Sequence, residues 1–181
     1  MKNLLTAIIL GIALAGVSMA QAPSKNMAGR AGKVRVAVVE FTPGPNASGM
    51  IPEAKRQLQA SIAFSLTQSE RFEVADVRNT RAVSQADLAA LNGGPTAAAV
   101  RVGKEMRAGF VLTGIVVEYN TKGSASVKYR LIEVSSGKVK YSGEYSHQTT
   151  DAMRSGSAAE MQTKVMKPLI GKLTDSMVAA F

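Results

Sequence analysis

One stretch of the sequence, residues 97–119, most constrains what the chain can fold into. It reads AAAVRVGKEMRAGFVLTGIVVEY, which predicts a short helix, a stop at Gly109 and then a long apolar strand. The apolar residues fall on both sides of the strand: Phe110, Leu112 and Val116 on one, and Val111, Ile115 and Val117 on the other. Such a strand is covered on both faces, so we expect it at the centre of a sheet. Gly114 inside it indicates a close approach by another segment.

The rest of the pattern predicts an α/β fold with a mixed sheet, in the order β-α-β-α-α-β-β-β-α. We expect strands at residues 34–41, 72–76, 110–119, 126–134 and 139–149, and helices at residues 52–69, 80–91, 97–108 and 158–180. The last three strands should form an antiparallel meander. Pro168 should kink or divide the terminal helix. Residues 42–50, TPGPNASGM, have the composition of a turn-rich loop.

The N-terminus has the features of a secretory signal peptide. Lys2 is followed by an apolar run over residues 4–17, and small residues precede a cleavage site after Ala20. The alternative, a membrane anchor, needs about 20 apolar residues, more than this run supplies. We therefore expect a signal peptide at residues 1–20, a flexible tail at 21–32 and a single domain at 33–181. The mature chain would be periplasmic, without a transmembrane segment.

The composition excludes several kinds of active site. The sequence has no cysteine, which removes disulfides, thiol nucleophiles and cysteine-ligated metals, and its only histidine, His147, cannot form a two-histidine site. No GxSxG turn is present, and the 13 acidic residues are scattered. We therefore expect no catalytic, metal-binding or cofactor-binding residues and no enzymatic activity. A hydrolase of an envelope polymer, with carboxylates from separate strands, remains a weaker alternative.

Phe64 is the first candidate for an interaction residue. The helix at residues 52–69 has an apolar stripe at helical spacing, formed by Ile51, Leu58, Ile62 and Leu66. Phe64 lies well away from that stripe, at about 100° of rotation per residue. Either another element of the fold covers its ring, or the ring contacts a partner.

A basic sheet face is the second candidate. The net charge of +9 favours anionic partners, but no run of basic residues with interleaved aromatics indicates nucleic acid. Alternation in the last two strands places Lys128, Arg130 and Lys140 on one face. These three residues form either a binding patch or a solvated surface.

Four segments, read together, resemble the CsgG-like family, the curli production assembly/transport components. The opening strand VAVVEF, residues 36–41, is followed by SERFEV at residues 69–74. VGK at residues 102–104 then leads into GFVLTG at residues 109–114, and RLIEV and SGKV follow at residues 130–134 and 136–139. The resemblance covers about residues 34–145, and its motifs concern the fold, not catalysis.

The resemblance implies a protein of secretion or envelope assembly that acts through contacts with cell-envelope proteins, with a homo-oligomer as one option. The chain departs from the channel members of the family. It has no cysteine after the signal peptide for a lipid, and it has no additional strands for an outer-membrane barrel. It therefore resembles the soluble periplasmic domain. Outer-membrane activators of peptidoglycan synthases look like the same domain, and they provide a second hypothesis.

Overall fold

The fold was analysed on a computed structural model that describes residues 32–181. The expected signal peptide at 1–20 and nearly all of the tail at 21–32 lie outside the described residues. The strands are β1 (Val34–Val38), β2 (Thr42–Asn46), β3 (Phe72–Val74), β4 (Phe110–Asn120), β5 (Ser124–Glu133) and β6 (Val139–Gln148). The helices are α1 (Pro52–Gln68), α2 (Val77–Ser84), α3 (Leu88–Gly93), α4 (Ala97–Glu105), α5 (Ala158–Met161) and α6 (Lys167–Ala179).

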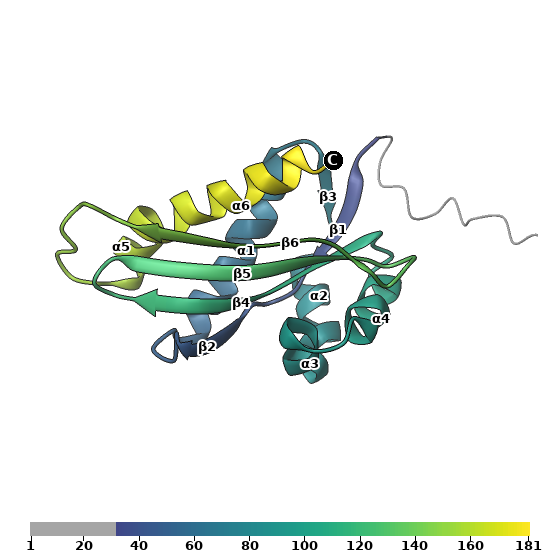
Figure 1. Cartoon of the computed structure of the whole chain (residues 1–181), viewed down its shortest axis with the longest axis horizontal. Helices are drawn as coiled ribbons and strands as arrows, with labels where there is room; N and C mark the ends of the chain where they lie inside the picture. The colour runs from purple at the N-terminus through teal and green to yellow at the C-terminus, as the bar shows by residue number, and fades with distance from the viewer. Residues whose placement is uncertain (1–31) are drawn as a thin grey trace, which may run out of the picture.

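The six strands form one mixed sheet, in which five follow the order β3-β1-β4-β5-β6 and β2 lies off this path and pairs with β4. β1 pairs in parallel with β3 and with the first residues of β4. β4, β5 and β6 form an antiparallel meander. β2 continues from β1 and pairs in parallel with the second half of β4. The predicted mixed α/β sheet, with β4 in its centre, is therefore confirmed (Figure 1).

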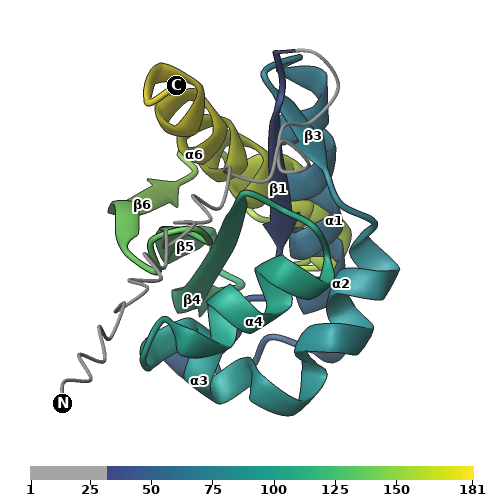
Figure 2. The ribbon, with the colours of Figure 1, turned by 90° about the vertical axis from the view of Figure 1, so that its right-hand side faces the viewer.

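Helices cover the sheet on two faces, and each face has its own core (Figure 2). On one face, α1 and α6 pack against the inward side chains Leu112 and Val116 of β4. On the other face, α2, α3 and α4 pack around Val111. These three β4 side chains are fully buried. β4 thus lies between two apolar cores and contributes side chains to both, as the apolar residues on both of its faces predict.

Gly114 makes the close approach that its position in β4 predicts. A Cβ atom at this residue would lie 2.3 Å from Cε2 of Phe41 and 2.7 Å from the backbone oxygen of Lys128. The Phe41 ring is fully buried and fills the space that a side chain would need. Only glycine fits at this point of the sheet.

Residues 42–50 differ from the predicted loop, because residues 42–46 form β2. Pro43 and Pro45 cannot donate backbone hydrogen bonds, and prolines in sheets are confined to edges and irregular positions. β2 fits that rule, since it pairs with β4 only and its register shifts between Pro43 and Asn46. Pairing with a distant strand, not local preference, makes this segment a strand.

The single helix predicted over residues 80–91 is divided into α2 and α3 by a 3-10 turn at Gln85–Asp87. The break turns α3 so that Asn92 reaches the sheet. Its Nδ2 donates to the backbone oxygen of Glu40 at 3.1 Å, and its Oδ1 accepts from the backbone N–H of Gly114 at 2.8 Å. Asn92 is 5% exposed, so its side-chain amide links α3 to the middle of the sheet through two buried hydrogen bonds.

The terminal helix is divided, as Pro168 predicts. A π-helical segment, Gln162–Met166, directly precedes α6, and Pro168, which has no backbone N–H to donate, lies in the first turn of α6. The three methionines Met161, Met166 and Met177 are buried in the core. In α1, Leu58, Ile62 and Leu66 are buried as the stripe predicts, but Ile51 is wrong as a stripe residue, because it caps the helix and is 55% exposed.

Candidate functional site

Phe64 is the most exposed large apolar side chain among the described residues, at 66%. It points outward from the middle of α1, because the core stripe of the helix occupies the opposite side. None of the described elements covers its ring, which removes one of the two explanations that the sequence leaves open. The partner-contact hypothesis for Phe64 remains.

Phe64 stands between two hollows of the surface. One is a groove of about 600 Å³ between α1 and the C-terminal helices. The other, of about 380 Å³, lies between α1 and the β3–α2 connection, and Ala60 and Phe64 line both. An exposed aromatic ring between two recesses is a surface into which a partner can place side chains on either side of the ring.

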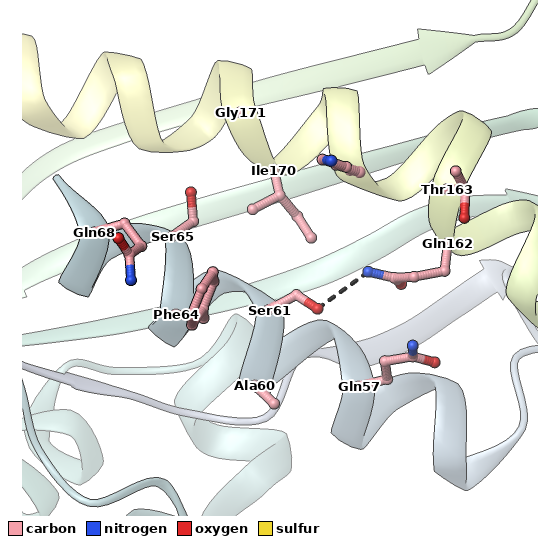
Figure 3. Close-up of a pocket in the computed structure, with 11 residues that line it drawn as sticks. Gln57, Ala60, Ser61, Phe64, Ser65, Gln68, Gln162, Thr163, Ile170 and Gly171 are labelled. Carbon is pink, nitrogen blue, oxygen red and sulfur yellow. Dashed lines mark hydrogen bonds between the residues drawn. The ribbon is translucent and has the colours of Figure 1, made fainter.

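The larger groove has an apolar floor and a polar rim (Figure 3). Ile170 of α6 forms part of its floor and is 5% exposed. Besides Phe64 and Ile170, the lining consists mostly of small and amide side chains: Gln57, Ala60, Ser61, Ser65, Gln68, Gln162, Thr163 and Gly171, with Lys167 as its charged member. Such a lining suits a protein surface better than a strongly charged ligand.

Two side-chain hydrogen bonds fix the width of this groove. Gln162 Nε2 donates to Ser61 Oγ at 3.0 Å, and Thr174 Oγ1 donates to Ser65 Oγ at 2.9 Å. Both tie α1 to the C-terminal helices across more than 100 residues of sequence. The groove is thus built before any partner arrives, which lowers the entropic cost of binding.

Glu160 holds the start of the C-terminal helices. Its carboxylate accepts hydrogen bonds from the backbone N–H groups of Arg154, Ser155 and Gly156, and it pairs with the Lys164 ammonium at 3.0 Å. These backbone hydrogen bonds, and then Lys164, lower the pKa of Glu160 from 4.5 to about 2. The loop before α5 is therefore anchored to the helix that carries Gln162.

The structure places Lys128, Arg130 and Lys140 at three different kinds of position. The Arg130 guanidinium donates to the backbone oxygens of Leu91 and Gly94, at 2.9 and 3.0 Å, so it joins the sheet to the end of α3. Lys128 is exposed and lies opposite Glu144 in the β5–β6 ladder. Lys140 is exposed and lies at a β-bulge, where the register between β5 and β6 shifts. Lys128 and Lys140 thus remain available to a partner, while Arg130 has a structural role.

Residues 32–181 contain no group of three or more His, Asp or Glu side chains that could hold a metal ion. Within the same range, none of the helices combines the length and apolar character that crossing a membrane takes. His147 lies on β6, where it pairs with Ala125 of β5.

Comparisons with known proteins were made for sequence and for structure. No protein-family model matches the sequence, and no curated protein matches it either. Solved structures do match. The PelC dodecamer from Paraburkholderia phytofirmans is 20% identical over 80% of this chain and 90% of that chain, with a TM-score of 0.51. LpoB from E. coli is 14% identical over 82% of this chain and 84% of that chain, with a TM-score of 0.50. The hypothetical protein CT253 from Chlamydia trachomatis is 16% identical over 81% of this chain and 94% of that chain, with a TM-score of 0.53.

These matches show that the chain shares its fold with PelC, LpoB and CT253. They span 80–82% of this chain and 84–94% of each matched chain, so most of each protein shares the fold. The finer resemblance to CsgG-like proteins stays a prediction from the sequence.

The sequence singled out Phe64 but not the groove beside it. The groove residues on α1 and at 162–171 are far apart in sequence, and most are glutamine, serine, threonine or alanine. One sequence feature could have indicated them: Ala60, Ser61 and Ser65 form a surface of small side chains on α1, next to the exposed ring.

Proposed function

We propose that this protein is a non-enzymatic component of the cell envelope that acts in secretion or envelope assembly by binding another protein. The observation that carries the proposal is Phe64, a 66% exposed ring beside a preformed groove with an apolar floor. The predicted signal peptide supports an envelope location, and the CsgG-like motifs of the sequence support a role in secretion.

The binding surface in this proposal consists of Phe64, Ile170 and the polar rim of the groove. Aromatic side chains in the centre of an interface contribute most of the binding free energy, and polar rims exclude water around them. The partner is therefore an envelope protein that presents an apolar side chain, such as leucine or phenylalanine, to the groove. The basic residues Lys128 and Lys140 lie on the sheet and are not part of this surface.

Deletion and complementation test the proposal. We expect a deletion strain to lose secretion of an extracellular protein or to assemble its envelope incorrectly. The Phe64→Ala variant should fail to complement the deletion at an unchanged protein level, whereas Glu105→Ala, an exposed position on the other helical layer, should complement it. An unchanged envelope and secretome in the deletion strain would overturn the function. Full complementation by Phe64→Ala would overturn the surface.

Activation of a peptidoglycan synthase is the second candidate function. It is supported by the fold that the chain shares with LpoB from E. coli, over 82% of this chain. The two candidates differ in what the purified protein does. An activator should raise the rate of a purified peptidoglycan synthase and should bind it in a pull-down, whereas a secretion component should do neither.

A homo-oligomer is compatible with both functions. The fold shared with the PelC dodecamer supports assembly from many copies, and the native mass of this protein in detergent-free buffer is the direct measurement. A mass of many subunits would support assembly into a closed oligomer. A monomer would leave binding of a different protein as the mode of action.

A further inference from the structure

Positively charged side chains gather at one end of the sheet. β1, β3 and β4 are parallel, so their first residues lie at the same end, where the β5–β6 hairpin also turns. The backbone N–H of Val34 donates to the oxygen of Arg71, which joins the start of β1 to that of β3. Gly109 N–H donates to the oxygen of Arg35, and Val134 N–H donates to that of Gly109, which continues the row to β5. In Figure 1 the hairpin lies at the right-hand side, and Figure 2 is viewed from there.

Each part of this row carries a lysine or an arginine. The cations come from four separate segments of the chain, and we call them together the basic end of the sheet: Lys33, Arg35, Arg71, Arg107, Lys138 and Lys140.

Five of these six cations have no acidic partner within residues 32–181. Arg35 pairs with Glu73 at 3.1 Å, and the other five belong to none of the ion pairs in that range. Lys33 is half-buried, and the remaining four are exposed. The acidic residues next to the row are Glu70 and Glu133, and the Ser136 hydroxyl donates a hydrogen bond to the Glu133 carboxylate. The basic end therefore presents an excess of positive charge to the solvent.

The sequence before β1 extends this excess. The chain enters β1 at the basic end, and residues 21–32 contain Lys25 and Arg30 but no acidic residue. An anionic partner at this end would therefore meet positive charge from the tail as well as from the domain.

Two exposed apolar side chains lie at the same end. Val139 is 42% exposed and stands between Lys138 and Lys140 in the sequence. Phe181 is 36% exposed, and its ring meets that of Phe110, the first residue of β4, at a centroid distance of 5.0 Å. Surfaces that combine basic with apolar side chains bind to the headgroup region of anionic membranes.

We propose that the basic end of the sheet docks this protein on a bilayer that contains anionic phospholipids, with Val139 among the headgroups. The cations form a row across several strands, and none of them lines the groove or the smaller hollow beside Phe64. Such a row matches negative charge that is spread over a plane, as in a layer of lipid headgroups, better than it matches one small ligand. Attraction to anionic lipids falls off within a Debye length, about 10 Å at 0.1 M salt, so the cations at the docked end dominate it.

This inference goes beyond the proposed function and does not depend on it. Phe64 and Ile170 are not part of the basic end, so the loss of lipid binding would leave the proposed protein-binding groove unchanged.

Sedimentation with vesicles tests the proposal on the exported chain, residues 21–181, which lacks the apolar run at residues 4–17. We expect binding to phosphatidylcholine vesicles that contain phosphatidylglycerol, at about 0.1 M salt, and none to vesicles of phosphatidylcholine alone. The double variant Lys138→Gln with Lys140→Gln should bind about 25-fold more weakly, since each cation near an anionic surface contributes about a fivefold gain in affinity.

The matched control removes the same charge at the opposite end of the sheet. Lys122 lies in the β4–β5 turn and Arg154 follows β6, and both are exposed and belong to none of the ion pairs within residues 32–181. Lys122→Gln with Arg154→Gln should bind the vesicles as the natural protein does. Equal losses from the two double variants would show attraction by total charge and overturn the docked end. Absence of binding by the natural protein would overturn the membrane as the partner and leave an acidic protein in its place.

Tryptophan fluorescence provides a second test, because the natural sequence contains no tryptophan. The emission of Val139→Trp should shift to shorter wavelength when phosphatidylglycerol vesicles are added, since its indole ring would move from water to the headgroup region. The matched control is Ile51→Trp, at a 55% exposed position before α1 and at the opposite end of the sheet, which should show no shift. Circular dichroism verifies that each variant is folded. A shift in both variants, or in neither, would contradict the proposed orientation.

Discussion

Gly114→Ala is the substitution for which the structure gives the sharpest stability prediction. The new methyl group would lie 2.3 Å from Cε2 and 2.6 Å from Cζ of Phe41, and 2.7 Å from the backbone oxygen of Lys128. Carbon atoms normally pack at about 3.5–4.0 Å, so each contact needs a displacement of roughly 1 Å. The Phe41 ring is fully buried, and the Lys128 backbone belongs to the β4–β5 ladder, so neither can withdraw into solvent.

Overpacking a core typically costs 1–3 kcal/mol, and a clash with both a buried ring and backbone belongs at the upper end, about 3 kcal/mol. With a urea m-value of about 2 kcal/mol/M, the midpoint of unfolding should fall by about 1.5 M. Equilibrium unfolding in urea, followed by circular dichroism, measures the shift. The slope of the transition should not change, because the surface exposed on unfolding is the same.

Gly171→Ala is the matched control, because it makes the same chemical change in open space. Gly171 lies inside α6, and a Cβ atom there would meet nothing within 4 Å. Alanine in a helix interior is more stable than glycine by about 0.5–1 kcal/mol, so this midpoint should rise by roughly 0.3–0.5 M. The reasoning about Gly114 would be refuted if Gly114→Ala unfolded within about 0.3 M urea of the natural protein.

Three further predictions concern other sites. Asn92→Ala leaves the buried backbone groups of Glu40 and Gly114 without partners, so it should lower the free energy of unfolding by about 2–4 kcal/mol in urea titrations. The pKa of Glu160 is about 2 in the folded protein, so the ionised carboxylate should stabilise the fold fully above pH 4.5 and lose this effect as the pH falls toward 2. The melting temperatures of the natural protein and of Glu160→Gln should therefore converge between pH 4.5 and pH 2. Phe181→Ala removes edge-to-face contacts with three aromatic rings, at centroid distances of 5.0–5.9 Å, and should cost about 2 kcal/mol in thermal unfolding.

The sequence predicted the features of the fold that depend on local periodicity. The apolar residues on both sides of residues 110–119 placed β4 in the centre of the sheet, and Gly114 marked a close contact that the structure contains. The helical spacing of Leu58, Ile62 and Leu66 predicted the side of α1 that is buried in the core. In each case the information lies within one turn of helix or a few residues of strand, where pattern and burial are directly linked.

Features that depend on distant contacts could not be predicted in this way. Residues 42–46 contain two prolines and look like a loop, yet they pair with β4, which is about 70 residues further along the chain. The break between α2 and α3 positions Asn92 for its buried hydrogen bonds with Glu40 and Gly114, and no residue pattern near position 85 predicts that break. Local preference is a weak guide wherever tertiary contacts decide the conformation.

The residues of the candidate binding surfaces also differ in whether a local sequence pattern or a distant contact determines their role. Phe64 was recognisable because it departs from the apolar stripe of its own helix, a local property. Arg130 has a different role from the expected basic patch, because the carbonyl groups that bind it belong to Leu91 and Gly94 at the end of α3, 39 and 36 residues earlier in the chain. The groove beside Phe64 is formed by segments about 100 residues apart, and its small polar side chains have no distinctive pattern in the sequence.

The position of β4 between two cores has a consequence for how such a domain can diversify. Each inward side chain of β4 belongs to one core or the other, so nearly every substitution in the buried part of this strand disturbs a core and destabilises the fold. The outward side of α1 and the outer edge of β6 belong to neither core's interior. These two surfaces can therefore change their partners while the fold is preserved, which allows proteins with this architecture to diverge in sequence and acquire different binding roles.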